Sequence, residues 1–250
     1  MESVFERIRA RTTPETRKKV AQEMNERIAI AKIVDEAYEL YMPQQRDEII
    51  DLTEFLYNHI RENELFLNLN ILEIGTKYGG TLLIWCRLVE QMSIDTSKAS
   101  IISVDMSDGG IHGGIADEDM DKRDLWFYER FPNVHFIRGN SHEKSTKIKV
   151  AEIIRNRRKI SSGNIQDIDF LFLDGDHSYE GIKQDWELYS PFVKKGGIIA
   201  LHDINDSERH RKRNVFVSKF WNEIKDDPKF ESFEINANED WAGIAVCIKK

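Results

Sequence analysis

From residue 70 onward, each short apolar run of the chain is followed by a glycine or polar turn and then by a stretch with helical periodicity. Strands that alternate with helices form right-handed crossovers, which produce a parallel sheet with helices on both faces. The runs agree with this, because buried parallel strands such as "IDFLFL" are apolar at nearly every position. The last two runs, "FESFEIN" and "WAGIAVCIK", have no helix between them and can form a hairpin. The sequence therefore predicts an α/β fold with a doubly wound, mostly parallel sheet.

Two helices are expected before the first strand. Thr13 and Pro14 suit an N-cap and a first helical turn, apolar residues then recur at steps of three and four, and Pro43 ends the helix. The stretch "QRDEIIDLTEFLYNHI" predicts the second helix. We assign residues 1–62 to an N-terminal helical extension and residues 63–250 to the main domain. The extension is expected to cover a site or to form the contact of a homo-oligomer.

Composition argues against several classes of function. The net charge of −8 disfavours general nucleic-acid binding, which needs positive charge against the phosphates. No apolar run approaches the roughly 18 residues of a membrane span, and the charged N-terminus does not resemble a signal peptide. The two cysteines, Cys86 and Cys247, are too few for a disulfide framework or a zinc site. They are expected to be buried thiols in a reducing cytoplasm.

The residues just after each strand are the candidates for ligand binding, because parallel α/β sheets bind ligands at the carboxyl ends of their strands. The first strand leads into "EIGTKYGG", in which Gly75 and Gly79 permit a tight turn before the next helix. Asp105 ends the second strand and suits hydrogen bonds from ribose hydroxyls. Together these features favour a nucleoside ligand, while the glycine spacing disfavours a nicotinamide oxidoreductase.

Polar residues also follow the third strand, in "GNSHEKST". Asn140, Ser141 and His142 are candidates for the rim of an adenine pocket. Capping of the next helix by Ser141 or Ser145 explains the same residues about as well.

Acids and histidines gather after the fourth and fifth strands. The stretch "LDGDH" contributes Asp174, Asp176 and His177, and "LHD" contributes His202 and Asp203. Such an oxygen-rich set with histidine suits Mg²⁺, Mn²⁺ or Ca²⁺, and also Fe²⁺. Helix capping explains any single acid equally well. Several acids desolvated together, however, need a counter-ion.

Several segments resemble class I S-adenosylmethionine-dependent methyltransferases. They are "ILEIGTKYGGTLLIW", "ISVDMSDGGIHGG", "FIRGNSHEKST", "IDFLFLDGDHSYEGIKQDWELYSPFVKKGGIIALHDI" and "FVSKFWNEIK" with "WAGIAV". Within that class, the chain is similar to the bacterial group of cephalosporin hydroxylase (methoxylation) and rhamnosyl O-methyltransferase proteins. The resemblance spans roughly residues 40 to 248, and the "DGDHSYEG" stretch with the following "GG" and "HD" is its most specific part. It implies a Rossmann-like fold of seven strands with the last antiparallel, and methyl transfer to a hydroxyl of a small molecule or sugar.

The resemblance also implies roles for individual residues. For the cofactor S-adenosylmethionine, it implies contacts from Glu73, Gly75, Gly79, Asp105, Ser141 and His142. Thr76, Tyr78, Asn140 and Asp174 are further expected cofactor residues, with the ring of Tyr78 over the sulfonium. Asp174, His202 and Asp203 stand where the catechol-type O-methyltransferases hold a divalent metal, here expected to be Mg²⁺ or another divalent cation. His202 departs from that pattern, because those enzymes have a carboxylate at this position.

Methyl transfer from a sulfonium is a direct displacement, so the protein must align the acceptor within roughly 3–3.5 Å of the methyl group and exclude water. A hydroxyl acceptor must also lose its proton. A metal ion assists this loss by lowering the pKa of the hydroxyl, or an imidazole accepts the proton. We assign Asp174 and His202 to catalysis, with His177 as the base or a substrate contact. The alternatives are a metal-independent methyltransferase that relies on His177, and an accessory subunit that binds the cofactor without chemistry of its own.

Two further features have both an ordinary and a functional explanation. The glycine-rich loop at residues 107–115, which includes His112, is a surface loop or a mobile lid over the site. The basic cluster at residues 208–213 is the solvated start of a helix or a grip on an anionic substrate. Three tryptophans are expected in the core rather than against the cofactor: Trp186, Trp221 and Trp241.

Overall fold

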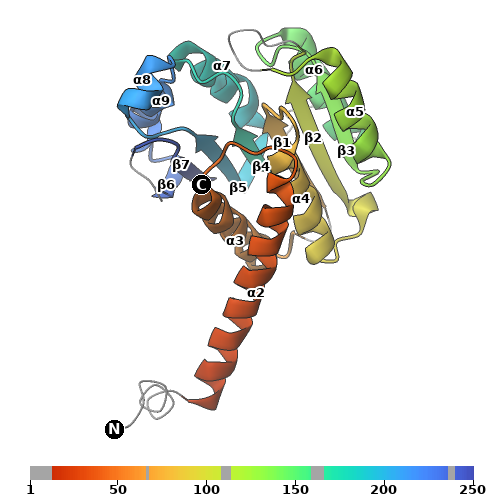
Figure 1. The fold of residues 1–250 in the computed structure, drawn as a ribbon, viewed down its shortest axis with the longest axis vertical. Helices are drawn as coiled ribbons and strands as arrows, with labels where there is room; N and C mark the ends of the chain where they lie inside the picture. Colours follow the sequence, from red (N-terminus) through yellow and green to blue (C-terminus); the bar gives the residue numbers. More distant parts are fainter. Residues whose placement is uncertain (1–12, 66–67, 108–113, 159–165, 236–239) are drawn as a thin grey trace.

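The computed structural model describes residues 13–65, 68–107, 114–158, 166–235 and 240–250. Its strands are β1 (Leu69–Ile74), β2 (Ala99–Asp105), β3 (Val134–Arg138), β4 (Ile168–Leu173), β5 (Val193–His202), β6 (Phe230–Ile235) and β7 (Ile244–Lys249). They form one seven-stranded sheet in the order β3-β2-β1-β4-β5-β7-β6 (Figure 1). Strands β1 to β5 pair in parallel, and β7 pairs antiparallel with both β5 and β6. The predicted doubly wound fold with a terminal hairpin is confirmed.

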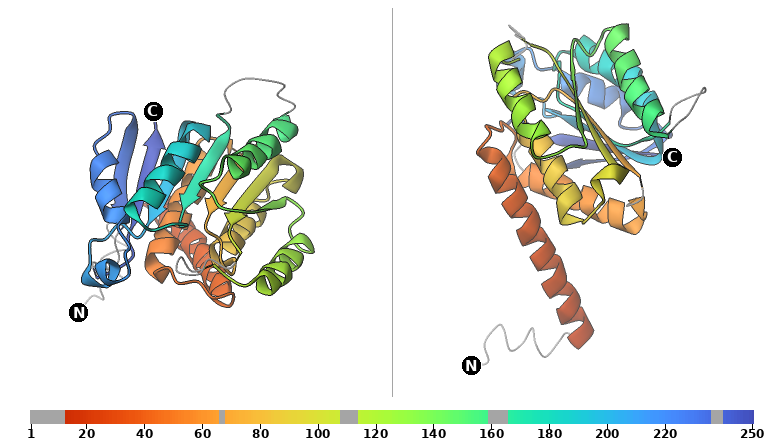
Figure 2. Two further views of the ribbon diagram at one scale, coloured as in Figure 1. Left: turned by 90° about the horizontal axis from the view of Figure 1, so that it is seen from above. Right: turned by 90° about the vertical axis from the view of Figure 1, so that its right-hand side faces the viewer.

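Helices cover both faces of this sheet (Figure 2). They are α2 (Pro14–Tyr38), α3 (Arg46–Glu62), α4 (Gly80–Gln91), α5 (Asp117–Tyr128), α6 (Lys144–Arg158), α7 (Tyr179–Tyr189), α8 (Glu208–Lys212) and α9 (Val217–Ile224). Side chains alternate between the faces of a strand. Phe170 and Phe172 of β4 therefore pack with α2, α3 and α4, whereas Leu171 and Leu173 pack with α6, α7 and α9.

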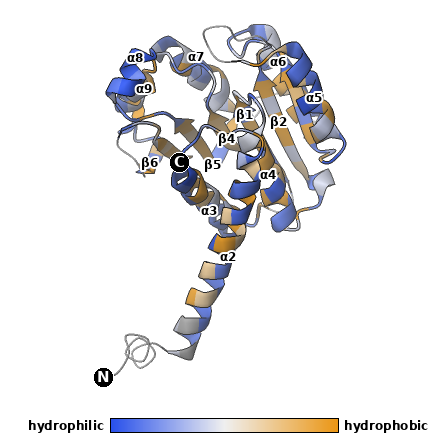
Figure 3. Ribbon diagram, viewed as in Figure 1, coloured by the Kyte–Doolittle hydropathy of each residue, from blue (hydrophilic) through white to orange (hydrophobic). Residues whose placement is uncertain are grey.

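The predicted N-terminal helices are confirmed. Thr13 caps α2, because its hydroxyl accepts a hydrogen bond from the backbone N–H of Thr16. The C-terminal half of α2 packs with α3 and α4 in the hydrophobic core on one face of the sheet. Its first half extends beyond the globular body (Figures 1 and 3). Along α2, the apolar side chains of Val20, Met24 and Ile28 are exposed. The homo-oligomer and the domain boundary after residue 62 stay predictions.

Other expectations from composition are also met. Cys86 and Cys247 are free and buried, and Trp186 and Trp221 lie in the core. Among the described residues, no helix combines the length and apolar character that crossing a membrane requires.

Candidate active site

Two adjoining cavities lie at the carboxyl ends of the parallel strands, where the sequence places its candidate residues. The larger cavity, of about 400 Å³, is lined by the loops after β1, β4 and β5, by residues 41–44 and by α8. The smaller, of about 160 Å³, is lined by the loops after β1 to β4. Gly75, Asp105 and Asp176 line both. The two spaces thus form one continuous site across the strand ends.

The glycines after β1 are required by close backbone contact. Gly75 has a φ of +88°, and a Cβ added there would lie 2.2 Å from the carbonyl oxygen of Asp174. Gly79 has a φ of +92°, and a Cβ there would lie 2.7 Å from the ring of Phe127. Glycine alone tolerates both restraints. The loop after β1 can therefore lie directly against the loop after β4.

The substitution Gly75→Ala is expected to lower the free energy of unfolding by about 3 kcal/mol or more, because it combines a backbone clash with left-handed strain. Gly196→Ala is the matched control. Gly196 also has a positive φ, of +78°, but nothing lies within 4 Å of its added Cβ, so only the strain of about 1 kcal/mol is expected. Urea unfolding of both variants measures the difference. Equal losses would contradict the close contact of the two loops.

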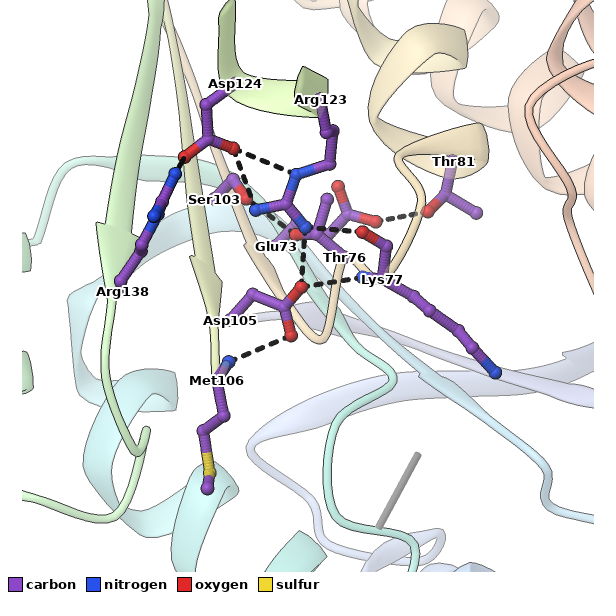
Figure 4. Close-up of polar contacts among 10 residues, drawn as sticks. All are labelled: Glu73, Thr76, Lys77, Thr81, Ser103, Asp105, Met106, Arg123, Asp124 and Arg138. Atoms are coloured by element: carbon purple, nitrogen blue, oxygen red, sulfur yellow. Dashed lines mark hydrogen bonds and ion pairs between the residues drawn. The ribbon is translucent and has the colours of Figure 1, made fainter. Parts of the chain in front are cut away.

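Glu73 is a buried acid at the end of β1. One carboxylate oxygen accepts a hydrogen bond from the hydroxyl of Thr81, and within the described chain the other has no hydrogen-bond partner (Figure 4). Burial raises the pKa of Glu73 to about 8. A buried carboxyl group with one oxygen that lacks a hydrogen-bond partner suits a cationic partner.

Asp105 is held in place by backbone and side-chain donors (Figure 4). Its Oδ2 accepts hydrogen bonds from the N–H of Lys77 at 2.9 Å and from Arg123 at 2.6 Å, and its Oδ1 accepts one from the N–H of Met106 at 2.9 Å. Burial raises the pKa of Asp105, and the neighbouring guanidinium opposes this rise. Arg123 also bonds to Asp124, which in turn binds Arg138. The predicted ribose acid is thus fixed, with room for a further donor on Oδ1.

Asn140, Ser141 and His142 line the smaller cavity, and their contact with adenine stays a prediction. The side chain of Asn140 accepts a hydrogen bond from the N–H of His142 at 2.9 Å, which shapes this turn. Nε2 of His142 lies 3.4 Å from Oδ1 of Asp185, a fully buried residue of α7. This carboxylate raises the pKa of His142. Asp185 therefore orients a predicted cofactor residue, a role that the sequence alone did not suggest.

The acids and histidines after β4 and β5 come together in the larger cavity. Nδ1 of His202 lies 3.1 Å from Oδ1 of Asp174 and 3.2 Å from Oδ1 of Asp203. Nδ1 of His177 lies 3.0 Å from Oδ2 of Asp203. Asp203 has a positive φ of 64°, an uncommon conformation for an aspartate and one that concentrates at functional sites. Asp176 is different, because it accepts a hydrogen bond from the N–H of Ser178 in the turn before α7.

These close contacts perturb proton binding. Desolvation disfavours the charged form of His202, but the carboxylates of Asp203 and Asp174 outweigh it and raise the pKa of His202 well above its ordinary value. Desolvation likewise opposes ionisation of Asp203, but the surrounding histidines hold its pKa well below its ordinary value. Desolvation also opposes charging of His177, and Asp203 more than offsets this to raise the pKa of His177. Without a ligand, the cluster thus favours an ionised Asp203 beside protonated imidazoles, so His177 must release its proton before it binds a cation or accepts a proton.

The same cluster has the donor set of a divalent cation site. Asp174, His177 and Asp203 each offer one ligand atom, and these atoms lie within 4.8 Å of one another. Oδ1 of Asp174 is buried and, in the described residues, accepts no hydrogen bond of good geometry. A bound cation would give this oxygen a partner. Two carboxylates and an imidazole fit Mg²⁺ or Mn²⁺. His177 takes the third position in this set. The predicted ligand His202 also lines the cavity, with its Nδ1 between the two acids, and its role as a ligand stays a prediction.

Two polar residues of the site had no signal in the sequence. Gln44 lies between α2 and α3, is 6% exposed, and donates from Nε2 to Oδ2 of Asp174 at 2.6 Å. Residues 41–44, which follow α2, thus contribute to the lining of the larger cavity, and the role of the extension as a cover of the site stays a prediction. His210 of α8 donates from Nδ1 to the carbonyl of Asn205, and its Nε2 lies 3.3 Å from Oδ1 of Asp203.

The remaining candidates lie at the margins of the site. Thr76 lines the larger cavity and shares a hydrogen bond of 2.6 Å with Ser103. Tyr78 is 39% exposed and is not among the described residues lining either cavity, so its contact with the sulfonium stays a prediction. Trp241 lines the larger cavity. The proposed lid, with His112, falls largely at residues 108–113, outside the described residues.

Sequence comparison relates the chain to one known family. A family model described as a methyltransferase domain matches residues 72–204, more than half of the chain. Uncharacterized protein R132 of Acanthamoeba polyphaga mimivirus is 28% identical over 165 residues, which are 64% of this chain and 65% of that protein. Uncharacterized protein y4gI of Sinorhizobium fredii is 22% identical over 156 residues, which are 62% of this chain and only 15% of that protein.

Solved structures share the fold at low sequence identity. The MycE methyltransferase of the mycinamycin biosynthetic pathway, in complex with Mg and SAH, matches with a TM-score of 0.54 and 14% identity over 88% of this chain and 54% of its own. The CMeT domain of citrinin polyketide synthase matches with a TM-score of 0.52 and 10% identity over 82% of this chain and 51% of its own. The chain belongs to the methyltransferase domain family and has the class I methyltransferase fold.

Proposed function

We propose that the chain is an S-adenosylmethionine-dependent O-methyltransferase that uses a divalent cation and acts on a hydroxyl of a small molecule or sugar. The observation that carries this proposal is the cluster of Asp174, His177 and Asp203, with ligand atoms within 4.8 Å, beside the cavity expected to hold the cofactor. The bound Mg and SAH named for the MycE structure support the same combination. A cytoplasmic location is part of the proposal.

The cofactor is expected to cross both cavities. Its adenine would lie beside Asn140 and His142 in the smaller cavity, and its ribose hydroxyls would donate to Oδ1 of Asp105. Its methionine part would lie in the larger cavity beside Gly75, with Glu73 buried at the end of the preceding strand. In this arrangement the methyl group would face the acid and histidine cluster, as a displacement reaction requires.

The residues of the cluster have distinct roles in this proposal. Asp174, Asp203 and His177 would hold the cation, which when bound would lower the pKa of the acceptor hydroxyl. His202, placed between the two carboxylates, would orient them, and Gln44 would fix the second oxygen of Asp174.

A metal-independent methyltransferase is the second candidate. It is favoured by the pairing of His177 with Asp203 at 3.0 Å, which would orient one ring nitrogen and leave the other for the acceptor proton. In that case His177 is the general base rather than a ligand.

Calorimetric titration of S-adenosylhomocysteine into the purified chain tests the cofactor site. We expect binding both with Mg²⁺ and with EDTA, because the cofactor contacts do not depend on the cation. Absence of binding under both conditions would contradict the proposed function. Binding without turnover of any acceptor, except with a second protein, would favour the accessory subunit.

A further inference from the structure

The arginine and lysine side chains of residues 209–213, which span α8 and its C-cap, fall into two pairs. The first pair is neutralised within the helix and the loop before it. Arg211 lies 2.5 Å from a carboxylate oxygen of Asp206, and Lys212 lies 2.7 Å from a carboxylate oxygen of Glu208. These two ion pairs are solvent-exposed. They leave Arg211 and Lys212 with local partners.

The second pair, Arg209 and Arg213, lines the larger cavity. In the part of the chain that the structure describes, neither has a carboxylate within ion-pair distance. The guanidinium of Arg209 lies 4.2 Å from the ring centroid of Trp241, which lines the same cavity. Two like charges four positions apart repel each other along one side of the chain, and an anion between them would relieve this repulsion.

The two arginines lie next to the acid and histidine cluster. His210, which follows Arg209 directly, approaches Oδ1 of Asp203 to 3.3 Å. Arg213 follows His210 by three residues, which is about one helical turn, and both arginines line the cavity. The cavity volume of about 400 Å³ suits a small molecule. An acceptor whose hydroxyl lies at the cluster would therefore extend toward the arginines.

We propose that the methyl acceptor carries an anionic group, a carboxylate or a phosphate, that Arg209 and Arg213 bind. This inference rests on the proposed function and specifies its substrate class. Arginine suits this task because its planar group binds carboxylate or phosphate oxygens in pairs, and the stacking on Trp241 orients one of the two groups in advance. Lys77, in the loop after β1, also lines this cavity.

The test compares two double variants that each remove two positive charges from the same segment: R209Q/R213Q and the matched control R211Q/K212Q. Each is saturated with S-adenosylhomocysteine and titrated with two pairs of probes. The pairs are 3,4-dihydroxybenzoate with catechol, and glucose 1-phosphate with methyl glucoside. In the wild type and the control, we expect one anionic probe to bind at least tenfold more tightly than its neutral counterpart. In R209Q/R213Q this preference should be lost.

The probe pair in which the anionic member binds more tightly than the neutral one identifies the group as a carboxylate or a phosphate. The inference is overturned if neither anionic probe is preferred by the wild type, or if both double variants lose the preference equally. R209K/R213K retains the charges and is expected to keep part of the preference, which separates charge from packing on Trp241. All variants should bind S-adenosylhomocysteine alike. Failure of the wild type to bind it would instead count against the proposed function.

Discussion

Asp203→Asn is expected to lower the rate of methyl transfer by about a thousandfold, within the 10²- to 10⁴-fold range typical of an essential acid–base group. Asp203 contributes one ligand atom of the candidate cation site and also holds Nδ1 of His177 at 3.0 Å. Its loss therefore removes either the cation or the orientation of the base. Asparagine is the suitable replacement, because it tolerates the positive φ of this position and keeps the shape of the side chain.

Asp206→Asn provides the matched control for this substitution. Asp206 lies three positions away, is exposed and pairs with Arg211 outside the cluster, so the variant should retain nearly full activity. Rates are measured with labelled S-adenosylmethionine, and thermal unfolding confirms that each variant is folded. Equal rates for Asp203→Asn and the wild type would contradict a role of the cluster in the reaction.

The same assay distinguishes the cation from the base. If the cation is required, EDTA removes activity, Mg²⁺ restores it, and Asp174→Ala is as damaging as Asp203→Ala. If His177 is the base, activity survives the chelator, and His177→Ala is far more damaging than Asp203→Ala. Activity that survives both EDTA and the two aspartate substitutions would remove the metal from the proposal.

The sheet and most of the strand-end residues followed from local pattern. Buried parallel strands are apolar throughout, and their carboxyl ends meet at one edge, so Asp105, Asp174 and Asp203 could be placed together before their geometry was known. The sequence pattern could not decide which histidine is the better cation ligand, because His177 and His202 both lie at the ends of strands. Only packing places Nδ1 of His202 between the two acids and His177 in the third position of the possible cation site.

The missed residues depend on contacts between distant parts of the chain. Gln44 reaches Asp174 across 130 positions, and its stretch "YMPQQ" resembles an ordinary helix connection. Arg123 and Asp185 occupy charged or amphipathic helices in which similar side chains usually face solvent. Their burial beside Asp105 and His142 is set by how α5 and α7 dock on the sheet, which sequence periodicity does not specify.

Glu73→Gln is expected to stabilise the ligand-free protein at high pH. Burial raises the pKa of Glu73 from 4.5 to about 8, so between these values the folded chain holds a proton that the unfolded chain has lost. Stability therefore falls as the pH rises through this interval, by up to about 5 kcal/mol above pH 8. Glutamine is neutral throughout and can keep the bond to Thr81. The variant should match the wild type near pH 4.5 and unfold at a higher temperature at pH 8.5.

Glu90→Gln is the control for this stability effect. It lies at an exposed position near the end of the same helix as Thr81 and should show no such dependence on pH.

Glu73→Gln is expected to weaken cofactor binding, although it stabilises the ligand-free protein. A cationic ammonium group near Glu73 favours its ionised form, so Glu73→Gln should weaken binding of S-adenosylhomocysteine about tenfold. Wild-type binding at pH 7 should also release a proton, seen as a binding enthalpy that changes with the ionisation enthalpy of the buffer. If the variant binds as tightly as the wild type, or if its stability gain is the same at pH 4.5 and 8.5, then Glu73 does not hold its proton for exchange with the cofactor.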